Sequence, residues 1–261
     1  MQYEVLTMKN LQWSQILSLL ENGEIRSAET KNGQWKANIE VKSAILDAFK
    51  NGRVIDYTNK GYPGFFDKDN LPTQQIDKDR NIRLVPGGSS IRAGSFIAEN
   101  VIIMPPSYIN IGAYIDTGSM VDSHVLVGSC AQIGKNVHLS AGVQIGGVLE
   151  PIGLNPVVIE DDAFIGAGSI IVEGIQISKR AIIAPGVILS KSIPVFDCVN
   201  DRVLERGEAI PRDAIVVGGT RPINKNLKWG NQEKLQMNCA IIPKYRDATT
   251  DSSLELEELL R

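Results

Sequence analysis

The chain has 261 residues, a formal net charge of −3 and a hydrophobic content of 43%, which is typical of an ordinary globular protein of one or two domains. Lys and Arg are scattered and slightly outnumbered by acids, so no nucleic-acid partner is expected, and no apolar run approaches the roughly 18 residues that a membrane span needs. Three widely spaced cysteines give neither a disulfide framework nor a CxxC metal site, which favours the cytoplasm.

Residues 1–82 predict a small helical N-terminal domain followed by a covering loop. Apolar residues recur at helical spacing between Leu11 and Leu20, and Gly23 is a stop signal. A second helix is predicted from Asn38 to Phe49. Residues 53–82 are polar with interspersed aromatics, Gly and Pro, as expected of a linker or covering loop.

From residue 91 onward, an aliphatic residue recurs every six positions. An α-helix with 3.6 residues per turn would spread such residues around its whole surface, so the spacing predicts short strands separated by turns. The residue four positions after each aliphatic is small or aliphatic, and we expect both positions to face a narrow interior. Three such repeats per coil would close a triangular prism whose coils stack about 4.8 Å apart. The repeating aliphatics are Ile91, Ile97, Ile103, Ile109, Ile115, Val121, Val127, Ile133, Leu139 and Ile145, then Ile159, Ile165, Ile171, Ile177, Ile183, Leu189 and Val195.

The repeat is interrupted across Gly146 to Val158. The step from Ile145 to Ile159 is 14 residues, so we expect two extra residues to shift the register there. Taken together, the hexads predict a mainly β solenoid over residues 83–197. Its handedness does not follow from the spacing.

Residues 198–261 predict a short C-terminal extension of strands and helix. Ala214 to Val217 and Cys239 to Ile242 have the composition of short strands. Leu254 to Arg261 predicts an acidic helical tail.

Two strings in the solenoid are more specific than the hexads. They are MVDSHVLVGSCAQIGKNVHLSAGVQIGGVLEP from Met120 and NPVVIEDDAFIGAGSIIVEG from Asn155, and they closely resemble the tetrahydrodipicolinate N-succinyltransferases, a family of hexapeptide-repeat acyltransferases. The resemblance extends over residues 35–246. It implies a left-handed parallel β-helix and a homotrimer with active sites between subunits. It also implies transfer of succinyl from succinyl-CoA to the amine of ring-opened tetrahydrodipicolinate, in the diaminopimelate route to lysine, without a metal.

Acyl transfer to an amine needs a base for the amine proton and donors for the developing oxyanion. Asp122 follows the inward Val121, so strand alternation turns it outward, and it matches the family's aspartate in MVD as base and substrate contact. The alternative is that Asp122 only caps a turn. Gly147 matches a family glycine whose amide faces the thioester carbonyl, with an ordinary loop glycine as the alternative.

Three further residues are weighed as site residues. Arg83 matches a family arginine and would grip a substrate carboxylate, unless it only seals the first coil. Lys244 is expected to contact a phosphate of CoA, with a plain solvated lysine as the alternative. His138 is a possible second base, because its pKa lies near neutrality, or a structural histidine.

The sequence departs from the family at two positions. Ile170 replaces a glutamate proposed to assist proton transfer, with nearby Glu173 as a weaker substitute, and His124 replaces a tryptophan. These departures leave open an acetyl-CoA-dependent N-acyltransferase acting on a related amino acid. A non-catalytic β-helix scaffold is a further alternative. A zinc β-helix carbonic anhydrase needs three histidine ligands, and this chain has two histidines.

Overall fold

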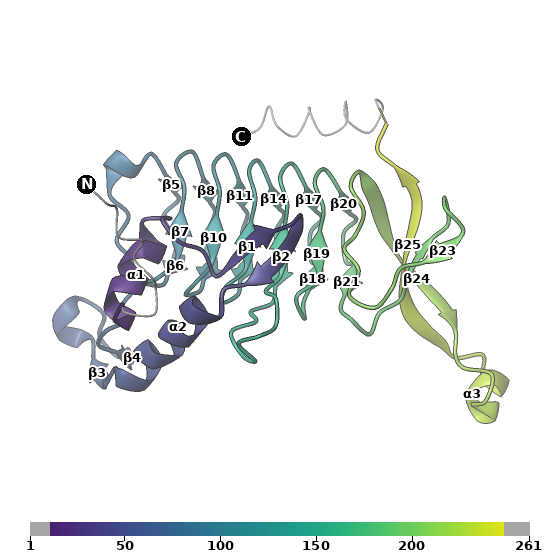
Figure 1. The fold of residues 1–261 in the computed structure, drawn as a ribbon, viewed down its shortest axis with the longest axis horizontal. Coiled ribbons are helices and arrows are strands. Elements are labelled where there is room, and N and C mark those ends of the chain that lie inside the picture. The colour runs from purple at the N-terminus through teal and green to yellow at the C-terminus, as the bar shows by residue number, and fades with distance from the viewer. Residues whose placement is uncertain (1–10, 248–261) are drawn as a thin grey trace.

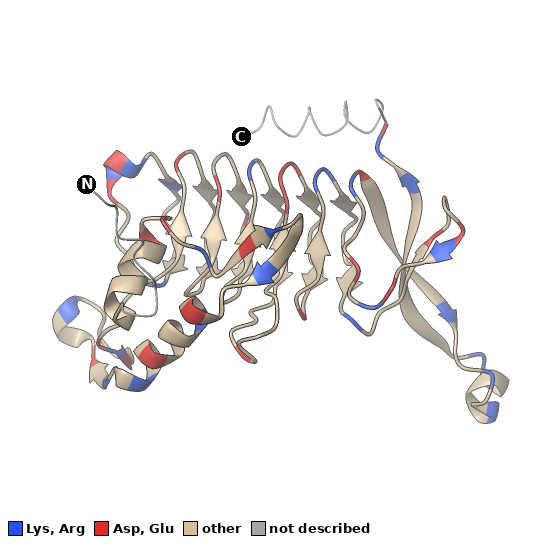
Figure 2. Cartoon of the chain, in the orientation of Figure 1, with Lys and Arg blue, Asp and Glu red and all other residues tan. Residues whose placement is uncertain are grey.

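A computed structural model describes residues 11–247 of the chain. A parallel β-solenoid lies between a helical N-terminal part and a C-terminal β-hairpin (Figure 1). Each hexad contributes one strand of two residues followed by a turn. Charged residues gather in the turns and at the two ends of the molecule, whereas the solenoid strands contain few of them (Figure 2). No helix within residues 11–247 is long and apolar enough to cross a membrane.

The strands form three faces of a triangular prism, and the chain visits them in a fixed order. We name each face by the number of strands in its sheet: six-stranded, five-stranded and ten-stranded. The six-stranded face holds β6 (Ser90–Ile91), β9 (Tyr108–Ile109), β12 (Leu126–Val127), β15 (Gln144–Ile145), β18 (Ile170–Ile171) and β21 (Ile188–Leu189). The five-stranded face holds β7 (Phe96–Ile97), β10 (Tyr114–Ile115), β13 (Gln132–Ile133), β16 (Val158–Ile159) and β19 (Gln176–Ile177). The solenoid part of the ten-stranded face holds β5 (Arg83–Leu84), β8 (Ile102–Ile103), β11 (Met120–Val121), β14 (His138–Leu139), β17 (Phe164–Ile165) and β20 (Ile182–Ile183).

Parallel pairing stacks the repeating aliphatics on one another through the interior. Ile115 pairs with Ile97 on one side and Ile133 on the other, and all three are buried. Burying such a side chain fully contributes about 1.5–3 kcal/mol. The position four residues later is also buried, as at Ser119, whose hydroxyl donates to the carbonyl of Gly134 at 2.7 Å and accepts from the amide of Val137 at 3.0 Å. The predicted left-handed parallel β-helix and its two inward positions are confirmed.

The interruption of the hexads is a looped-out insertion, so the predicted two-residue shift was wrong. Ile133 pairs with Ile159 across 26 residues, whereas Ile115 pairs with Ile133 across 18. Eight residues therefore leave the coil between β15 and β16, and no strand is skipped. The physical reason is that every coil must place a strand on each face, so extra residues can only leave as a loop at a corner.

The N-terminal part contains the two predicted helices and a hairpin that the sequence pattern did not indicate. The helices are α1 (Trp13–Glu21) and α2 (Ile39–Asn51), and the hairpin between them pairs β1 (Ala28–Lys31) with β2 (Gln34–Ala37). The covering segment contains the pair β3 (Val54–Asp56) and β4 (Phe66–Lys68) with the short 3-10 helices η2 (Thr58–Lys60) and η3 (Lys78–Arg80). The side chain of Asn38 caps α2 by accepting from the amide of Val41 at 3.3 Å.

This N-terminal part covers the five-stranded face. The guanidinium of Arg26 lies 3.7 Å from the ring centre of Tyr114, and its Nε donates to Gln132 at 2.8 Å. The indole of Trp35 donates to the carboxylate of Glu160 at 3.0 Å. Burial at this contact lowers the pKa of Arg26. The outer sides of the six-stranded and ten-stranded faces receive no such cover within residues 11–247.

The C-terminal part extends the ten-stranded face and then leaves it as a long hairpin (Figure 1). It comprises β22 (Val195–Asp197), β23 (Arg202–Val203), β24 (Ala214–Pro222), α3 (Lys228–Gln232) and β25 (Gln236–Tyr245). The two predicted strands are present, but both are longer than predicted, because antiparallel pairing with each other satisfies their backbones beyond the solenoid. The predicted acidic tail from Leu254 to Arg261 lies outside the described residues.

Candidate active site

Asp122 lies at the corner after β11, where the chain turns from the ten-stranded to the six-stranded face. Its amide donates to the carbonyl of Leu139 at 2.9 Å, and its Oδ1 accepts from the amide of Ser123 at 2.7 Å. The turn-capping contact is therefore present. The side chain is half-buried, and within residues 11–247 its Oδ2 accepts no hydrogen bond. One carboxylate oxygen holds the turn, and the other remains available for a proton.

Gly147 lies in the turn after β15, at the start of the looped-out insertion. A side-chain Cβ at this position would meet the amide nitrogen of Ser129 at 2.6 Å. The close approach of two backbones therefore requires glycine here. Gly147 is an exposed residue, and its amide donates to no acceptor in the described part of the chain. A free amide in a fixed turn is a suitable donor for an oxyanion.

One copy of the chain does not bring Asp122 and Gly147 together. Asp122 lies in the turn through which the chain enters the six-stranded face at β12 (Leu126–Val127). Gly147 lies in the turn through which the chain leaves this face after β15 (Gln144–Ile145). The two residues therefore lie on opposite edges of that face. A site that uses both residues requires the edges of two neighbouring chains.

Arg83 and Lys244 lie on the ten-stranded face but far apart on it. Arg83 is exposed on β5, the outermost strand, and five strands separate β5 from β24. Lys244, on β25, pairs in register with Ile215 of β24, and its Nζ lies 3.4 Å from the carboxylate of Asp247. The two residues cannot contact the same small group within one chain.

The two histidines have different surroundings. His138 is half-buried on the outer side of β14, and its ring centre lies 4.9 Å from that of Phe164. His124 is exposed in a turn with φ of 62°, and its amide donates to the carbonyl of Pro106 at 2.8 Å. No cluster of three or more metal-ligating side chains occurs among the residues that the structure describes.

Ile170 and Glu173 lie beside the Gly147 turn. Ile170 is half-buried on the outer side of the six-stranded face, between Gln144 and Ile188. Glu173 is exposed in the next coil's turn, and its carboxylate accepts from the amide of Lys191 at 2.8 Å. These two turns stack directly, because the amide of Gly146 donates to Ile171 at 2.8 Å. Glu173 is thus the candidate carboxylate that the fold brings nearest to the Gly147 turn.

The N-terminal part also contacts the looped-out insertion. The sequence pattern did not indicate this contact. The buried Lys42 of α2 donates from Nζ to the carbonyl of Leu154 at 2.7 Å. The side chain of Asn155 accepts from the amide of Ala37 at 2.8 Å and donates to the carbonyl of Trp35 at 2.9 Å. Burial lowers the pKa of Lys42. A lysine in an amphipathic helix is normally solvated, so no sequence signal marks this one.

Comparisons with known proteins identify families and relatives that this chain resembles. A family model described as the N-terminal part of tetrahydrodipicolinate N-succinyltransferase matches residues 11–50, and one described as the hexapeptide repeat of succinyl-transferase matches residues 156–191. A protein of Salmonella arizonae named 2,3,4,5-tetrahydropyridine-2,6-dicarboxylate N-succinyltransferase is 45% identical over 258 residues, which cover 95% of this chain and 88% of the relative. A protein of Salmonella typhi with the same name is 45% identical over 257 residues, with 95% and 87% coverage. A solved structure from Campylobacter jejuni, titled as a putative 2,3,4,5-tetrahydropyridine-2-carboxylate N-succinyltransferase, has a TM-score of 0.46 and 14% identity over 89% of this chain and 63% of that chain.

Proposed function

The chain belongs to the tetrahydrodipicolinate N-succinyltransferases, and we propose from this membership that it transfers the succinyl group of succinyl-CoA to the amine of ring-opened tetrahydrodipicolinate. The product continues along the diaminopimelate route to lysine. The observation that carries the proposal is the 45% identity to named relatives over 95% of the chain. The three free cysteine thiols fit a reaction in the reducing cytoplasm.

The reaction forms one C–N bond and breaks one C–S bond. The amine nitrogen attacks the thioester carbonyl carbon, and the carbonyl oxygen becomes an oxyanion before the CoA thiolate leaves. Asp122 takes the proton released by the amine through its free carboxylate oxygen, and the thiolate is then protonated to free CoA. The unpaired amide of Gly147 donates to the oxyanion.

Arg83 and Lys244 act on the charged ends of the two substrates. Arg83 is exposed, and its planar guanidinium suits a carboxylate of the acceptor. Lys244 is exposed on the C-terminal hairpin, where it would contact a phosphate of acyl-CoA held along a neighbouring chain.

We place the active sites between the subunits of a homotrimer. The outer row of the ten-stranded face is apolar except for His138 and is half-buried in the isolated chain. Asp122 and Gly147 lie on opposite edges of the six-stranded face. In a ring of three copies, the edge of one copy that carries Asp122 contacts the edge of the next copy that carries Gly147. Such a ring also buries the uncovered faces. The row consists of the apolar side chains Ile102, Met120, Phe164, Ile182 and Ile215, with the imidazole of His138 between Met120 and Phe164.

Product analysis tests the proposed function. Incubation with succinyl-CoA and tetrahydrodipicolinate is expected to give an N-succinyl product, identified by mass spectrometry, together with free CoA. Ile170 and His124 depart from the family pattern, and this favours an acetyl-CoA-dependent activity as the second candidate. A parallel incubation with acetyl-CoA that gives the dominant product would establish that second candidate instead.

A further inference from the structure

Six turns stack at the edge where the chain passes from the ten-stranded to the six-stranded face, and we call it the Asp122 edge. The turns consist almost entirely of Gly, Ala, Ser, Pro and Val. Their ionisable side chains are confined to one turn, where Asp122 and His124 lie two residues apart. The six turns comprise residues 85–89, 104–107, 122–125, 140–143, 166–169 and 184–187.

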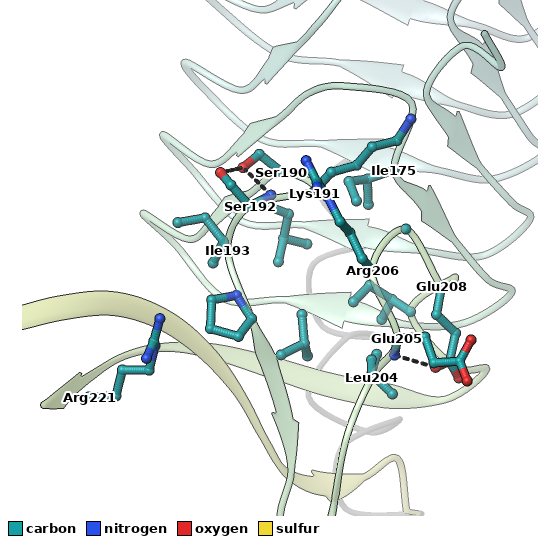
Figure 3. A pocket seen from close by; sticks show the side chains of 15 residues that line it. Ile175, Ser190, Lys191, Ser192, Ile193, Leu204, Glu205, Arg206, Glu208 and Arg221 are labelled. Carbon is teal, nitrogen blue, oxygen red and sulfur yellow. Dashed lines mark hydrogen bonds between the residues drawn. The ribbon is translucent and has the colours of Figure 1, made fainter. Parts of the chain in front are cut away.

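The other two edges of the solenoid carry charges in several coils. On the edge that contains Gly147, charged residues lie in the turns after β6, β18 and β21, namely Arg92, Glu173 and Lys191. Figure 3 shows Lys191 of this edge lining a pocket at the C-terminal end of the solenoid. Each turn of the third edge, after β7, β10, β13, β16 and β19, contains a charged residue, among them Glu99, Asp116, Lys135, Asp161 and Lys179. The pair of Asp122 and His124 is therefore a local exception on an otherwise uncharged edge.

The backbone of His124 is fixed, whereas its side chain is available. Its amide donates to the carbonyl of Pro106 in the preceding coil at 2.8 Å, and its carbonyl accepts from the side chain of Gln144 at 3.3 Å. The amide of Gly142 in the next coil donates to the carbonyl of Ser123 at 2.8 Å. The residue is exposed, and its imidazole forms no hydrogen bond or ion pair within residues 11–247. A rigid turn thus presents an imidazole to a ligand.

Few titratable groups surround this turn. The two turns stacked against it contain none, and Asp122 is the one carboxylate in the turn itself. On the adjoining strands, His138 is in register with Met120, and Tyr108 is in register with Leu126. An imidazole changes its charge between pH 5 and pH 8, and its protonated form has two N–H donors. Once protonated, the histidine of this turn is a cation beside the candidate base.

The acceptor has two carboxylates, and the strand register supplies one cation for each. Ring-opened tetrahydrodipicolinate is a seven-carbon dicarboxylate whose amine is bonded to the carbon next to one carboxylate. When Asp122 takes the amine proton, this carboxylate lies beside the same turn. Arg83 is in register with Ile102, and Ile102 is in register with Met120, so Arg83 lies two coils away. Two coils span about 10 Å, which the carbon chain and the long arginine side chain bridge.

We propose that protonated His124 binds the carboxylate next to the reacting amine, while Arg83 binds the distant carboxylate. This inference rests on the proposed function, which supplies the acceptor. The imidazolium donates a charge-assisted hydrogen bond to the acceptor and offsets the repulsion between its carboxylate and that of Asp122. His124 is therefore a specificity-determining contact for amines that carry an adjacent carboxylate.

Titration calorimetry of the full-length protein with pimelate tests this contact. Pimelate is the unsubstituted seven-carbon dicarboxylate, and it has no amine, so its charge stays nearly constant between pH 6 and pH 8.5. We expect wild type to bind pimelate about tenfold or more weakly at pH 8.5 than at pH 6, because the charge-assisted hydrogen bond is lost when the imidazole is neutral.

Two variants assign this pH dependence to His124. Asn tolerates the left-handed backbone at φ of 62° but carries no charge, so His124→Asn is expected to bind weakly at both pH values. Lys stays charged over this interval, so His124→Lys is expected to bind pimelate equally at both. Asp201→Asn is the matched control, because Asp201 is an exposed turn residue with φ of 51° outside the Asp122 edge. It is expected to bind pimelate as wild type does.

Each outcome decides the inference. Wild type that does not bind pimelate at pH 6, or that shares its pH dependence with His124→Asn, overturns it. A His124→Lys protein that binds no better than His124→Asn overturns it as well. Weak binding by His124→Asn together with pH-independent binding by His124→Lys supports it. Pimelate binding needs no acyl transfer, so this support stands even if no succinyl product forms, and in that case only the proposed function fails.

Discussion

The two oxygens of the Asp122 carboxylate have separate roles. Asn at this position keeps the Oδ1 acceptor for the amide of Ser123 but cannot take a proton from an amine. We expect Asp122→Asn to retain the fold and to lower kcat by about 10²-fold or more. Steady-state kinetics and circular dichroism check both parts.

A matched control separates catalysis from turn capping. Asp116 occupies the same place one hexad earlier, and its Oδ1 accepts from the amide of Thr117 at 2.8 Å. Asp116→Asn is expected to leave kcat within a few-fold of wild type. Equal losses in the two variants would assign Asp122 to turn capping alone.

The residue Ile170 tests whether the missing family glutamate matters. Its apolar side chain lies half-buried between Gln144 and Ile188, and we expect it to lower the local dielectric there. If Asp122 supplies proton transfer without help, the native chain transfers succinyl and Ile170→Glu gains little. Measurement of kcat/KM with both acyl donors checks this. An inactive native chain whose Ile170→Glu variant transfers succinyl would refute this account of the proton transfer.

The element that links the N-terminal part to the site is the looped-out insertion between Gly146 and Val157. Lys42 holds its far end through Leu154, so Lys42→Met leaves that carbonyl without its charged donor. We expect the free energy of unfolding to fall by about 1–3 kcal/mol and the KM for succinyl-CoA to rise several-fold, because the Gly147 turn loses its support. Urea unfolding and steady-state kinetics measure the two effects.

Lys50→Met is the control for this prediction, since Lys50 lies on the same helix and is exposed. Its stability and KM are expected to match those of wild type. A Lys42→Met protein with lower stability but an unchanged KM would show that the lysine supports the fold without positioning the loop.

The contact between α2 and the solenoid also has a pH dependence. Burial raises the pKa of the Cys130 thiol to about 11, above its ordinary value of 9.0. The unfolded thiol ionises first as pH rises, so the stability that the neutral buried thiol provides is present below pH 9 and is lost between pH 9 and 11. The loss is expected to reach about 3 kcal/mol.

Urea unfolding at pH 8 and pH 10.5 measures this loss, and Cys130→Ala removes the thiol while keeping other titrating groups. The variant is expected to lose less stability than wild type over this interval. Identical losses in the two proteins would show that Cys130 does not cause the dependence.

Sequence spacing could predict the strands because each one is fixed locally. The inward aliphatic and the small residue four positions later define a coil without reference to distant residues, and Val121 with Val125 is one such pair. The buried Lys42 depends on a contact with Leu154, 112 residues further along the chain, and the length of the insertion follows from the pairing of Ile133 with Ile159. A one-dimensional pattern contains neither contact. Resemblance to the family identified Asp122 and Gly147 as candidate site residues. That they lie on opposite edges of one face became clear only from the strand register in the structure.

The whole molecule is predicted to be a trimer whose subunits contact one another through the faces that the N-terminal part does not cover. Ile102→Glu places a charge in the apolar outer row of the ten-stranded face, and burying an unpaired carboxylate there is unfavourable. We expect the variant to dissociate and to lose activity in parallel. Light scattering coupled to size-exclusion chromatography gives the mass, and Val54→Glu, on an exposed strand of the covering segment, is the control. A fully active wild-type monomer at assay dilution would contradict the shared active site.

The central claim concerns the acyl donor and the acceptor together, and one assay tests both. Thiol release is followed with succinyl-CoA or acetyl-CoA, each with and without tetrahydrodipicolinate. Membership of the N-succinyltransferase family predicts release that requires tetrahydrodipicolinate and is much faster with succinyl-CoA. Release that is independent of the acceptor, or faster with acetyl-CoA, would contradict this account.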